Sequence, residues 1–281
     1  MPDPSSLFAG SSTTEEGTTR RGVSQFRRIW TASEPRAEVL LLHGIAEHSG
    51  RYEHVGTTLS AAGFSTRAID HYGHGRSGGI RGHVPSFDTF LDDVEDNLAE
   101  LREQGRPVVL MAHSMGGLIA FLYCVSERPL PDVLLLSGPA LGADPPRWQT
   151  ALAPILGRLR PKLFIKSDFD GAMLSTDPDV GNAYIEDPLR VDGATAGLGH
   201  AIFTAMKEAN ENLERLSIPT LVVHGGNDRI VPPHFTEPIG ELAVASRQVL
   251  PGLEHEVLNE PNWKSTMQAF IGFTNGALGP R

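Results

Sequence analysis

The sequence predicts an α/β fold, with a mostly parallel central sheet, helices on both faces and a helical cap inserted into the chain. Short apolar runs alternate with segments of helical periodicity, the pattern of parallel strands joined by helices. The alternation stops over residues 141–216 and then resumes, which indicates an insertion. Open α/β sheets bind ligands beyond the carboxyl ends of their strands, so we expect the insertion to lie over that edge.

Strands are expected where compact apolar runs lie between turn residues. Their ranges are 23–30, 38–42, 64–69, 107–111, 132–137, 219–223 and 247–250. Helices are expected over residues 51–62, 86–103, 115–127, 235–245 and 263–273. The second of these helices has its apolar residues on one face, and we expect its acidic residues to form a solvated face. These are Asp88, Asp92, Asp93, Glu95 and Asp96.

Domain organisation follows from the same pattern. Residues 1–22 are rich in Ser, Thr, Gly and Glu and are expected to form a mobile tail. Residues 23–140 and 217–281 would form the core, and residues 141–216 the cap.

Composition excludes several classes of protein. The formal net charge of −10 argues against a nucleic-acid partner and against strong electrostatic attraction to anionic membranes. Cys124 is the single cysteine, which excludes an intrachain disulfide. No apolar run approaches the ~20 residues needed to span a bilayer, and the N-terminus lacks the apolar core of a signal peptide. We therefore expect a cytoplasmic protein.

A serine lies at the apex of a tight strand-to-helix turn. The apolar run that ends at Met111 is followed by Ala112-His113-Ser114-Met115-Gly116-Gly117 and then by a helix-forming run. Small residues two before and two after the serine let the strand and helix backbones approach each other. This pattern is the nucleophile elbow, with Ala112 where glycine is commoner.

A serine nucleophile needs a histidine base and an acid, which follow it in that fold in the order acid, histidine. Asp228 lies just past the strand at 219–223, whereas Asp132 starts a strand and the aspartates from Asp144 to Asp192 belong to the insertion. His255 lies just past the last strand, whereas His234 opens a helix. We therefore predict a Ser114–His255–Asp228 triad.

Two backbone N–H groups are required to hold the oxyanion of such a reaction. One is expected from Met115, the residue after the nucleophile. The other is expected from the loop after the earlier strand, at Ile45.

Two further patterns are not expected to bind anything. Residues 73–78 match the Gly-x-Gly-x-x-Gly dinucleotide pattern, but no helix opens within it, so no cofactor is predicted. None of the eleven histidines forms a metal-binding pair on a helix, so no metal is predicted.

The motifs together resemble the monoacylglycerol lipase family of α/β-hydrolases, in its bacterial form with a compact cap. The resembling segments are His43-Gly44-Ile45-Ala46-Glu47-His48-Ser49-Gly50, Asp70-His71-Tyr72-Gly73-His74-Gly75-Arg76-Ser77, His113-Ser114-Met115-Gly116-Gly117, His224-Gly225-Gly226-Asn227-Asp228 and Leu253-Glu254-His255-Glu256. The resemblance implies hydrolysis of monoacylglycerols to fatty acid and glycerol by the α/β-hydrolase fold. It implies the same triad and oxyanion residues, and it puts Glu47 near a glycerol pocket, with a carboxylate that braces the loop as the other interpretation.

The cap is expected to line a tunnel for the acyl chain, although ordinary packing explains part of its apolar set. That set is Trp148, Leu152, Ile155, Leu156, Ile202 and Phe203. An apolar cap rim would also allow shallow peripheral docking on a membrane, driven by hydrophobic contact because the net charge is negative. A broader carboxylesterase or lysophospholipase remains the alternative activity, and a non-catalytic lipid-binding protein is the alternative of another class.

Overall fold

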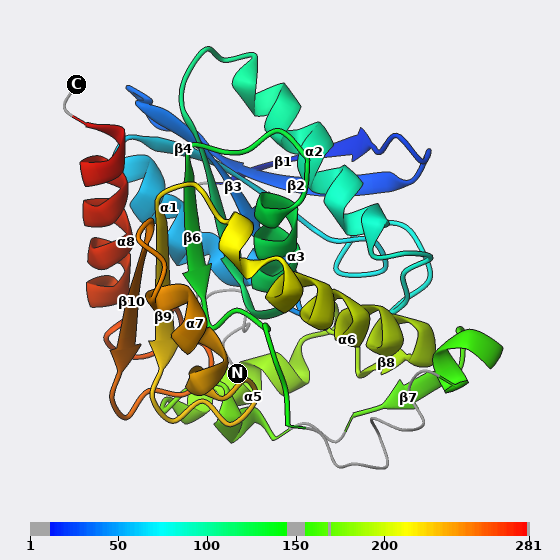
Figure 1. Cartoon of the computed structure of the whole chain (residues 1–281). Helices are drawn as coiled ribbons and strands as arrows, with labels where there is room; N and C mark the ends of the chain where they lie inside the picture. The colour runs from blue at the N-terminus through cyan, green and yellow to red at the C-terminus, as the bar shows by residue number, and fades with distance from the viewer. Residues whose placement is uncertain (1–11, 145–154, 168–169, 280–281) are drawn as a thin grey trace.

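A computed structural model describes residues 12–144, 155–167 and 170–279, and its centre is an eight-stranded sheet (Figure 1). The strand order is β1-β2-β4-β3-β5-β6-β9-β10, and all neighbours are parallel except β1 with β2 and β2 with β4. The strands are β1 Thr13–Thr18, β2 Ser24–Trp30, β3 Ala37–Leu42, β4 Phe64–Ile69, β5 Val108–His113, β6 Val133–Ser137, β9 Thr220–Gly225 and β10 Ala245–Leu250. The predicted mostly parallel sheet is confirmed.

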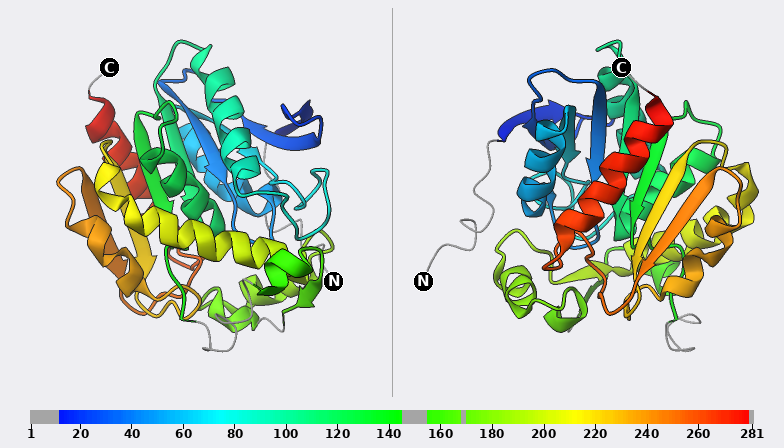
Figure 2. Two further views of the ribbon diagram at one scale, coloured as in Figure 1. Left: turned by 45° about the vertical axis from the view of Figure 1, so that its right-hand side comes forward. Right: turned by 90° about the vertical axis from the view of Figure 1, so that its left-hand side faces the viewer.

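Helices cover both faces of the sheet. Helices α1 (Glu53–Ala61) and α8 (Trp263–Leu278) pack on one face, and α2 (Asp88–Arg102) and α3 (Ser114–Val125) on the other (Figure 2). Successive residues of a strand point to opposite faces, so Leu40 and Leu110 join the core under α2 and α3 while Leu41 and Met111 join the core under α1 and α8. Burial on both faces explains why these strands read as continuous apolar runs.

The cap lies beyond the carboxyl ends of the parallel strands, along the lower edge of Figure 1. It holds α5 (Pro178–Glu186), α6 (Ala196–Glu211) and a small antiparallel sheet of β7 (Phe164–Lys166) and β8 (Gly193–Thr195). The predicted insertion is therefore not purely helical. Residues 155–159 of the cap are also helical, and short 3-10 turns lie at Ser49–Tyr52, Gly171–Met173, Leu213–Arg215 and Pro233–Thr236.

The helix expected over residues 235–245 is much shorter than predicted. A 3-10 turn ends there at Thr236, α7 covers Glu237–Gly240, and β10 already begins at Ala245. The prediction of a mobile tail is also wrong for Thr13–Thr18, which form β1 at the sheet edge. Backbone pairing with β2 over six residues orders this polar segment although it has little apolar surface to bury.

The sequence pattern predicted that the acidic face of α2 is solvated, and the structure shows that this is only partly correct. Arg21 and Arg128 both bind the Asp92 carboxylate, and Arg20 binds Asp96. Asp93 is buried to 98%, and its Oδ1 has no hydrogen-bond partner among the described residues. The face is thus partly a docking surface for the arginines of the β1–β2 turn.

No helix in the described part of the chain is long and apolar enough to cross a membrane.

Candidate active site

Ser114 lies at the junction of β5 and α3, in a backbone conformation that is rare for a residue with a side chain. Its φ is +52°, in the left-handed region. The turn requires glycine at position 116, because a Cβ on Gly116 would lie 2.5 Å from the His43 carbonyl oxygen. Ala112, where glycine is commoner, is fully packed in the core. The elbow therefore closes tightly against the end of β3.

Three polar side chains from separate strand ends form one hydrogen-bonded line. The Ser114 Oγ lies 2.8 Å from His255 Nε2, and His255 Nδ1 lies 2.6 Å from Asp228 Oδ2. Asp228 is fixed in turn by the N–H groups of Ile230 and Val231, which donate to its Oδ1 at 2.9 and 2.8 Å. The three side chains that sequence reasoning selected are thus brought together, and all are buried.

The charges along this line favour a basic imidazole. Burial alone would lower the pKa of His255, but the Asp228 carboxylate, with smaller contributions from Glu256 and Glu47, outweighs it, so the pKa of His255 is raised. Burial alone would raise the pKa of Asp228, yet His255 and the surrounding donors hold it well below its usual range. Asp228 is therefore ionised, and His255 has a larger affinity for a proton than a free imidazole.

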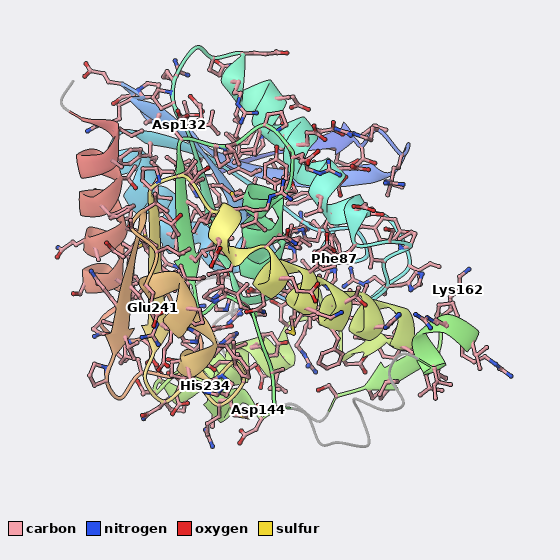
Figure 3. The ribbon with its side chains drawn as sticks, viewed as in Figure 1. Phe87, Asp132, Asp144, Lys162, His234 and Glu241 are labelled. Atoms are coloured by element: carbon pink, nitrogen blue, oxygen red, sulfur yellow. The ribbon has the colours of Figure 1, made fainter. Side chains whose placement is uncertain are left out.

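The other candidates weighed in the sequence lie elsewhere (Figure 3). Asp132 precedes β6 at the opposite end of the sheet, where it accepts a hydrogen bond from the Val108 N–H at 2.7 Å. Asp144 and His234 lie together in Figure 3, 4.0 Å apart, and both side chains are more than half exposed. None of these three takes part in the line through Ser114.

The glycine-rich segment 73–78 folds around a carboxylate. Gly73 N–H donates to the Gly78 carbonyl at 2.9 Å, and Asp70 accepts from the Arg76 N–H at 2.7 Å. A Cβ at Gly75 would lie 2.0 Å from Asp70 Oδ2, so glycine is required for this closure. Among the described residues, no cluster of three or more His, Cys, Asp or Glu side chains could hold a metal ion.

A cavity of about 450 Å³ opens above Ser114, between the strand ends and the cap. Of the apolar cap residues expected to line a tunnel, Leu156 and Phe203 line it, and Ile45, predicted as an oxyanion donor, lines it as well. Ile155 does not line it and is 52% exposed, and Ile202 packs against the core instead. Trp148 and Leu152 lie outside the described residues.

Met115, the other predicted oxyanion donor, is buried in the first turn of α3.

Several cavity residues escaped the sequence analysis. Tyr184 on α5 lines the cavity, with the Arg51 guanidinium 5.0 Å from its ring centre. Ile165 on β7 and Val191 before β8 also line it. Neither an isolated tyrosine in a short helix nor an apolar residue in a three-residue strand carries a pattern that a sequence could reveal.

Glu47 acts within the loop that follows β3. Its Oε1 accepts from the Gly44 N–H at 2.5 Å and from the Tyr52 hydroxyl at 2.7 Å, and its Oε2 accepts from Arg51 at 2.9 Å. Burial raises the pKa of Glu47 against the opposing effect of Arg51. Both oxygens are used by the protein, which favours the interpretation that this carboxylate braces the loop, although it also lines the cavity.

Comparison with known proteins gives consistent matches over most of the chain. The model of the Hydrolase_4 family (serine aminopeptidase, S33) matches residues 33–262. The chain is 37% identical to a monoacylglycerol lipase of Mycolicibacterium smegmatis over 255 residues, which cover 86% of this chain and 90% of that lipase. It is 29% identical to a phospholipase of Bacillus subtilis, with 88% and 98% of the two chains covered.

Among solved structures, a monoacylglycerol lipase of Paleococcus ferrophilus is similar with a TM-score of 0.83. Its sequence is 32% identical, and the match covers 90% of this chain and 99% of that one. This likeness confirms the expected α/β-hydrolase fold.

Proposed function

Because the chain belongs to the Hydrolase_4 family and to its monoacylglycerol lipases, we propose that it hydrolyses the ester bond of monoacylglycerols, releasing a fatty acid and glycerol. The observation that carries this proposal is the hydrogen-bonded line from Ser114 through His255 to Asp228, which lies at the floor of the cavity under the cap. The cavity walls supplied by the cap are mostly aliphatic and aromatic, which suits an acyl chain.

The reaction proposed for this line is a two-step acyl transfer. His255 takes the Ser114 proton as the Oγ attacks the ester carbonyl, and the resulting tetrahedral intermediate collapses as His255 protonates the departing glycerol oxygen. Water then enters, gives a proton to His255 and attacks the acyl-enzyme, and the fatty acid leaves as Ser114 regains its proton. Asp228 holds the imidazole in the tautomer that presents Nε2 to the serine, and it stabilises the imidazolium.

The oxyanion would be held by the backbone N–H groups of Met115 and Ile45. Met115 supports this role because its N–H belongs to the first turn of α3, where backbone donors have no partner within the helix. Ile45 supports it because it lines the cavity on the side of β3. Each donor of this kind contributes roughly 3–4 kcal/mol to the transition state.

The decisive experiment labels the protein with a fluorophosphonate and then measures fatty-acid release from 1- and 2-monoacylglycerols. Ser114→Ala should abolish both labelling and release, because it removes the nucleophile while leaving the elbow backbone intact. Ser126→Ala, which alters a serine after α3, is the matched control and should retain both. Failure of the folded wild-type protein to label would favour a non-catalytic lipid-binding protein.

A lysophospholipase is the second candidate, since a phospholipase is among the relatives. It shares the acyl chain with the first candidate and differs in the headgroup, so rates on monoacylglycerols and lysophosphatidylcholines of equal chain length distinguish them. Equal rates on short p-nitrophenyl esters and long monoacylglycerols would favour a broad carboxylesterase instead.

We further propose that the cap docks on a lipid surface through the cap tip, defined as residues 158–166. Leu159 is 74% exposed, and Leu163 and Ile165 are about half exposed beside it. Four exposed cations share the segment and no acidic residue does. These are Arg158, Arg160, Lys162 and Lys166, of which Lys162 projects outward in Figure 3. Lys166 pairs with Asp192 at 3.0 Å, and the other three give the segment a positive charge, opposite to the net charge of the whole chain. Docking would therefore be both hydrophobic and electrostatic, rather than purely hydrophobic.

Sedimentation with vesicles tests this docking. Each cation near an anionic surface contributes about 1 kcal/mol, so the double variant Arg158→Gln/Arg160→Gln should bind vesicles with 30% phosphatidylglycerol roughly 30-fold more weakly than the wild type. Lys207→Gln, which removes an exposed cation from α6, is the control. Equal binding of the double variant and the control would contradict the proposal.

A further inference from the structure

Two buried histidines connect the loop after β3 to the loop after β4. The His71 backbone N–H donates to His43 Nε2 at 3.0 Å, and the His71 ring Nε2 lies 3.1 Å from the His43 carbonyl oxygen. Each ring thus binds the other residue's backbone. Both side chains are fully buried, with ring centres 4.3 Å apart.

The partners of His43 define its tautomer. Nε2 accepts a hydrogen bond from the His71 N–H, so it carries no proton, and the ring proton is on Nδ1. Nδ1 lies 2.7 Å from the Gly44 carbonyl oxygen and donates to it. By the same reasoning His71 carries its proton on Nε2, which donates to the His43 carbonyl. Burial lowers the pKa of both rings, which keeps them in these neutral forms.

This arrangement fixes the direction of one peptide group. The Gly44 carbonyl and the Ile45 N–H belong to the same planar trans peptide and point in opposite directions. Because the carbonyl is bound by the His43 ring, the Ile45 N–H is directed away from that ring. The Gly44 N–H is already used by Glu47. In the described part of the chain, the Ile45 N–H donates to no other group.

The same loop contacts the nucleophile. A Cβ at Gly44 would lie 3.1 Å from the Ser114 Cβ, and one at Gly116 would lie 2.5 Å from the His43 carbonyl oxygen. The His43 backbone is therefore packed between the His71 ring and the elbow, and the peptide that follows it lies beside Ser114.

We propose that His43 and His71 are positioning residues for the oxyanion hole: the His43 Nδ1–H holds the Gly44–Ile45 peptide with its N–H towards Ser114, and the His71 Nε2–H anchors the peptide before it. This inference rests on the proposed serine hydrolase function. Neither histidine touches the substrate, so both act through the backbone. Loss of either ring donor would let the peptide turn and would remove one oxyanion donor without removing the nucleophile.

Amide side chains test the two rings separately. Asparagine places its amide nitrogen where His Nδ1 lies, and glutamine places it where His Nε2 lies. His43→Asn should therefore retain activity, whereas His43→Gln should lower kcat about 10²-fold or more with little change in KM, the loss typical of one oxyanion donor. At position 71 the order reverses, because the donor there is Nε2: His71→Gln should retain activity, and His71→Asn should lower kcat.

If the two histidines acted only by packing, the same substitution, asparagine or glutamine, would give the higher kcat at both positions. That outcome, or an unchanged kcat in all four variants, would overturn the inference. Thermal unfolding of each variant separates loss of kcat from loss of fold. If His43→Gln does not fold, position 71 still tests the inference: folded His71→Asn should have a lower kcat with an unchanged KM, and His71→Gln should not, whereas an equal kcat in the two variants overturns it. If the wild-type protein hydrolyses no ester, the proposed function fails. If it hydrolyses esters but the same substitution gives the higher kcat at both positions, only this inference fails.

Discussion

The strand-end side of the cavity and its cap side are built in opposite ways. On the strand-end side, buried polar groups from several loops bind one another, as in Glu47 with Arg51 and in Asp228 with His255. On the cap side, the cavity is lined mostly by apolar side chains such as Leu156 and Phe203, while the cap tip leaves Leu159 exposed. Hydrogen bonds on the strand-end side fix the positions of individual atoms, whereas packing on the cap side only sets the shape and polarity of the cavity.

This difference implies that the two sides of the cavity have different roles in the reaction. Changes on the strand-end side should alter the rate of bond cleavage, because they move charges and donors that act in the transition state. Changes on the cap side should alter which acyl chain fits and should leave the chemical step intact. Each prediction below tests one side of this division or its physical basis.

Asp228→Asn should have the largest effect on the strand-end side. The amide cannot stabilise the imidazolium and would favour the wrong tautomer of His255, so we expect kcat to fall by roughly 10⁴-fold. Hydrolysis of a soluble short-chain ester measures this without interference from lipid surfaces. Asp144→Asn, at an exposed position, is the control and should be neutral. A fall of less than tenfold would assign the acid role to another residue.

The pH dependence of kcat/KM should report the raised pKa of His255. The neutral imidazole is the active form, so activity should fall tenfold per pH unit on the acid side, with a midpoint above the ordinary histidine value of about 6.5. In Asp228→Asn the carboxylate that raises this pKa is gone and burial remains, so the residual activity should titrate at lower pH. A midpoint that stays in place in this variant would show that Asp228 does not set the pKa.

How far the sequence predicts this molecule depends on which side of the cavity is considered. Ser114, Asp228 and His255 could be selected because each follows an apolar run, and the carboxyl ends of parallel strands share one edge of a sheet. The cap gives no such rule. Its strands have only three residues each, and Tyr184 reaches the cavity through packing that no periodicity encodes.

Two errors of the sequence analysis come from tertiary context in the core. β1 is polar and forms because β2 offers an unpaired edge. Asp93 is enclosed although it lies on the charged side of α2, where the arginines bind its neighbours Asp92 and Asp96 and leave it without such a contact. Such long-range contacts between a turn and a helix cannot be read from helical periodicity.

Asp93 tests the rule that buried charge in the core must be paired. Burial, reinforced by Asp96 and Asp92, raises its pKa to about 7. The folded protein thus holds a proton that the unfolded chain releases near pH 4, so the stability from neutral Asp93 is present below pH 4 and is lost as the pH rises through 7.

Asp93→Asn mimics the neutral form at every pH. It should therefore raise the free energy of unfolding at pH 8 by roughly 1–4 kcal/mol and leave it nearly unchanged at pH 4. Chemical denaturation at the two pH values measures this. Asp96→Asn, which removes the partner of Arg20 at a more exposed position, should lower stability by less than about 1 kcal/mol. A destabilised Asp93→Asn at pH 8 would show that the carboxylate is charged and paired in the folded protein.

Gly199 offers a way to change the cap side of the cavity alone. It lies on α6, it lines the cavity, and a Cβ there would meet nothing within 4 Å. Gly199→Leu should therefore extend a side chain from a free Cβ into the space proposed for the acyl chain, and it should lower kcat/KM for long-chain relative to short-chain monoacylglycerols by about tenfold. Gly272→Leu, on the exposed side of α8, is the matched control because a Cβ there also meets nothing. Both variants should gain up to about 1 kcal/mol of stability from replacing a helical glycine, but only Gly199→Leu should shift the chain-length profile. Equal loss on short and long chains would mean that the cap also acts on the chemical step, and the division between the two sides of the cavity would then fail.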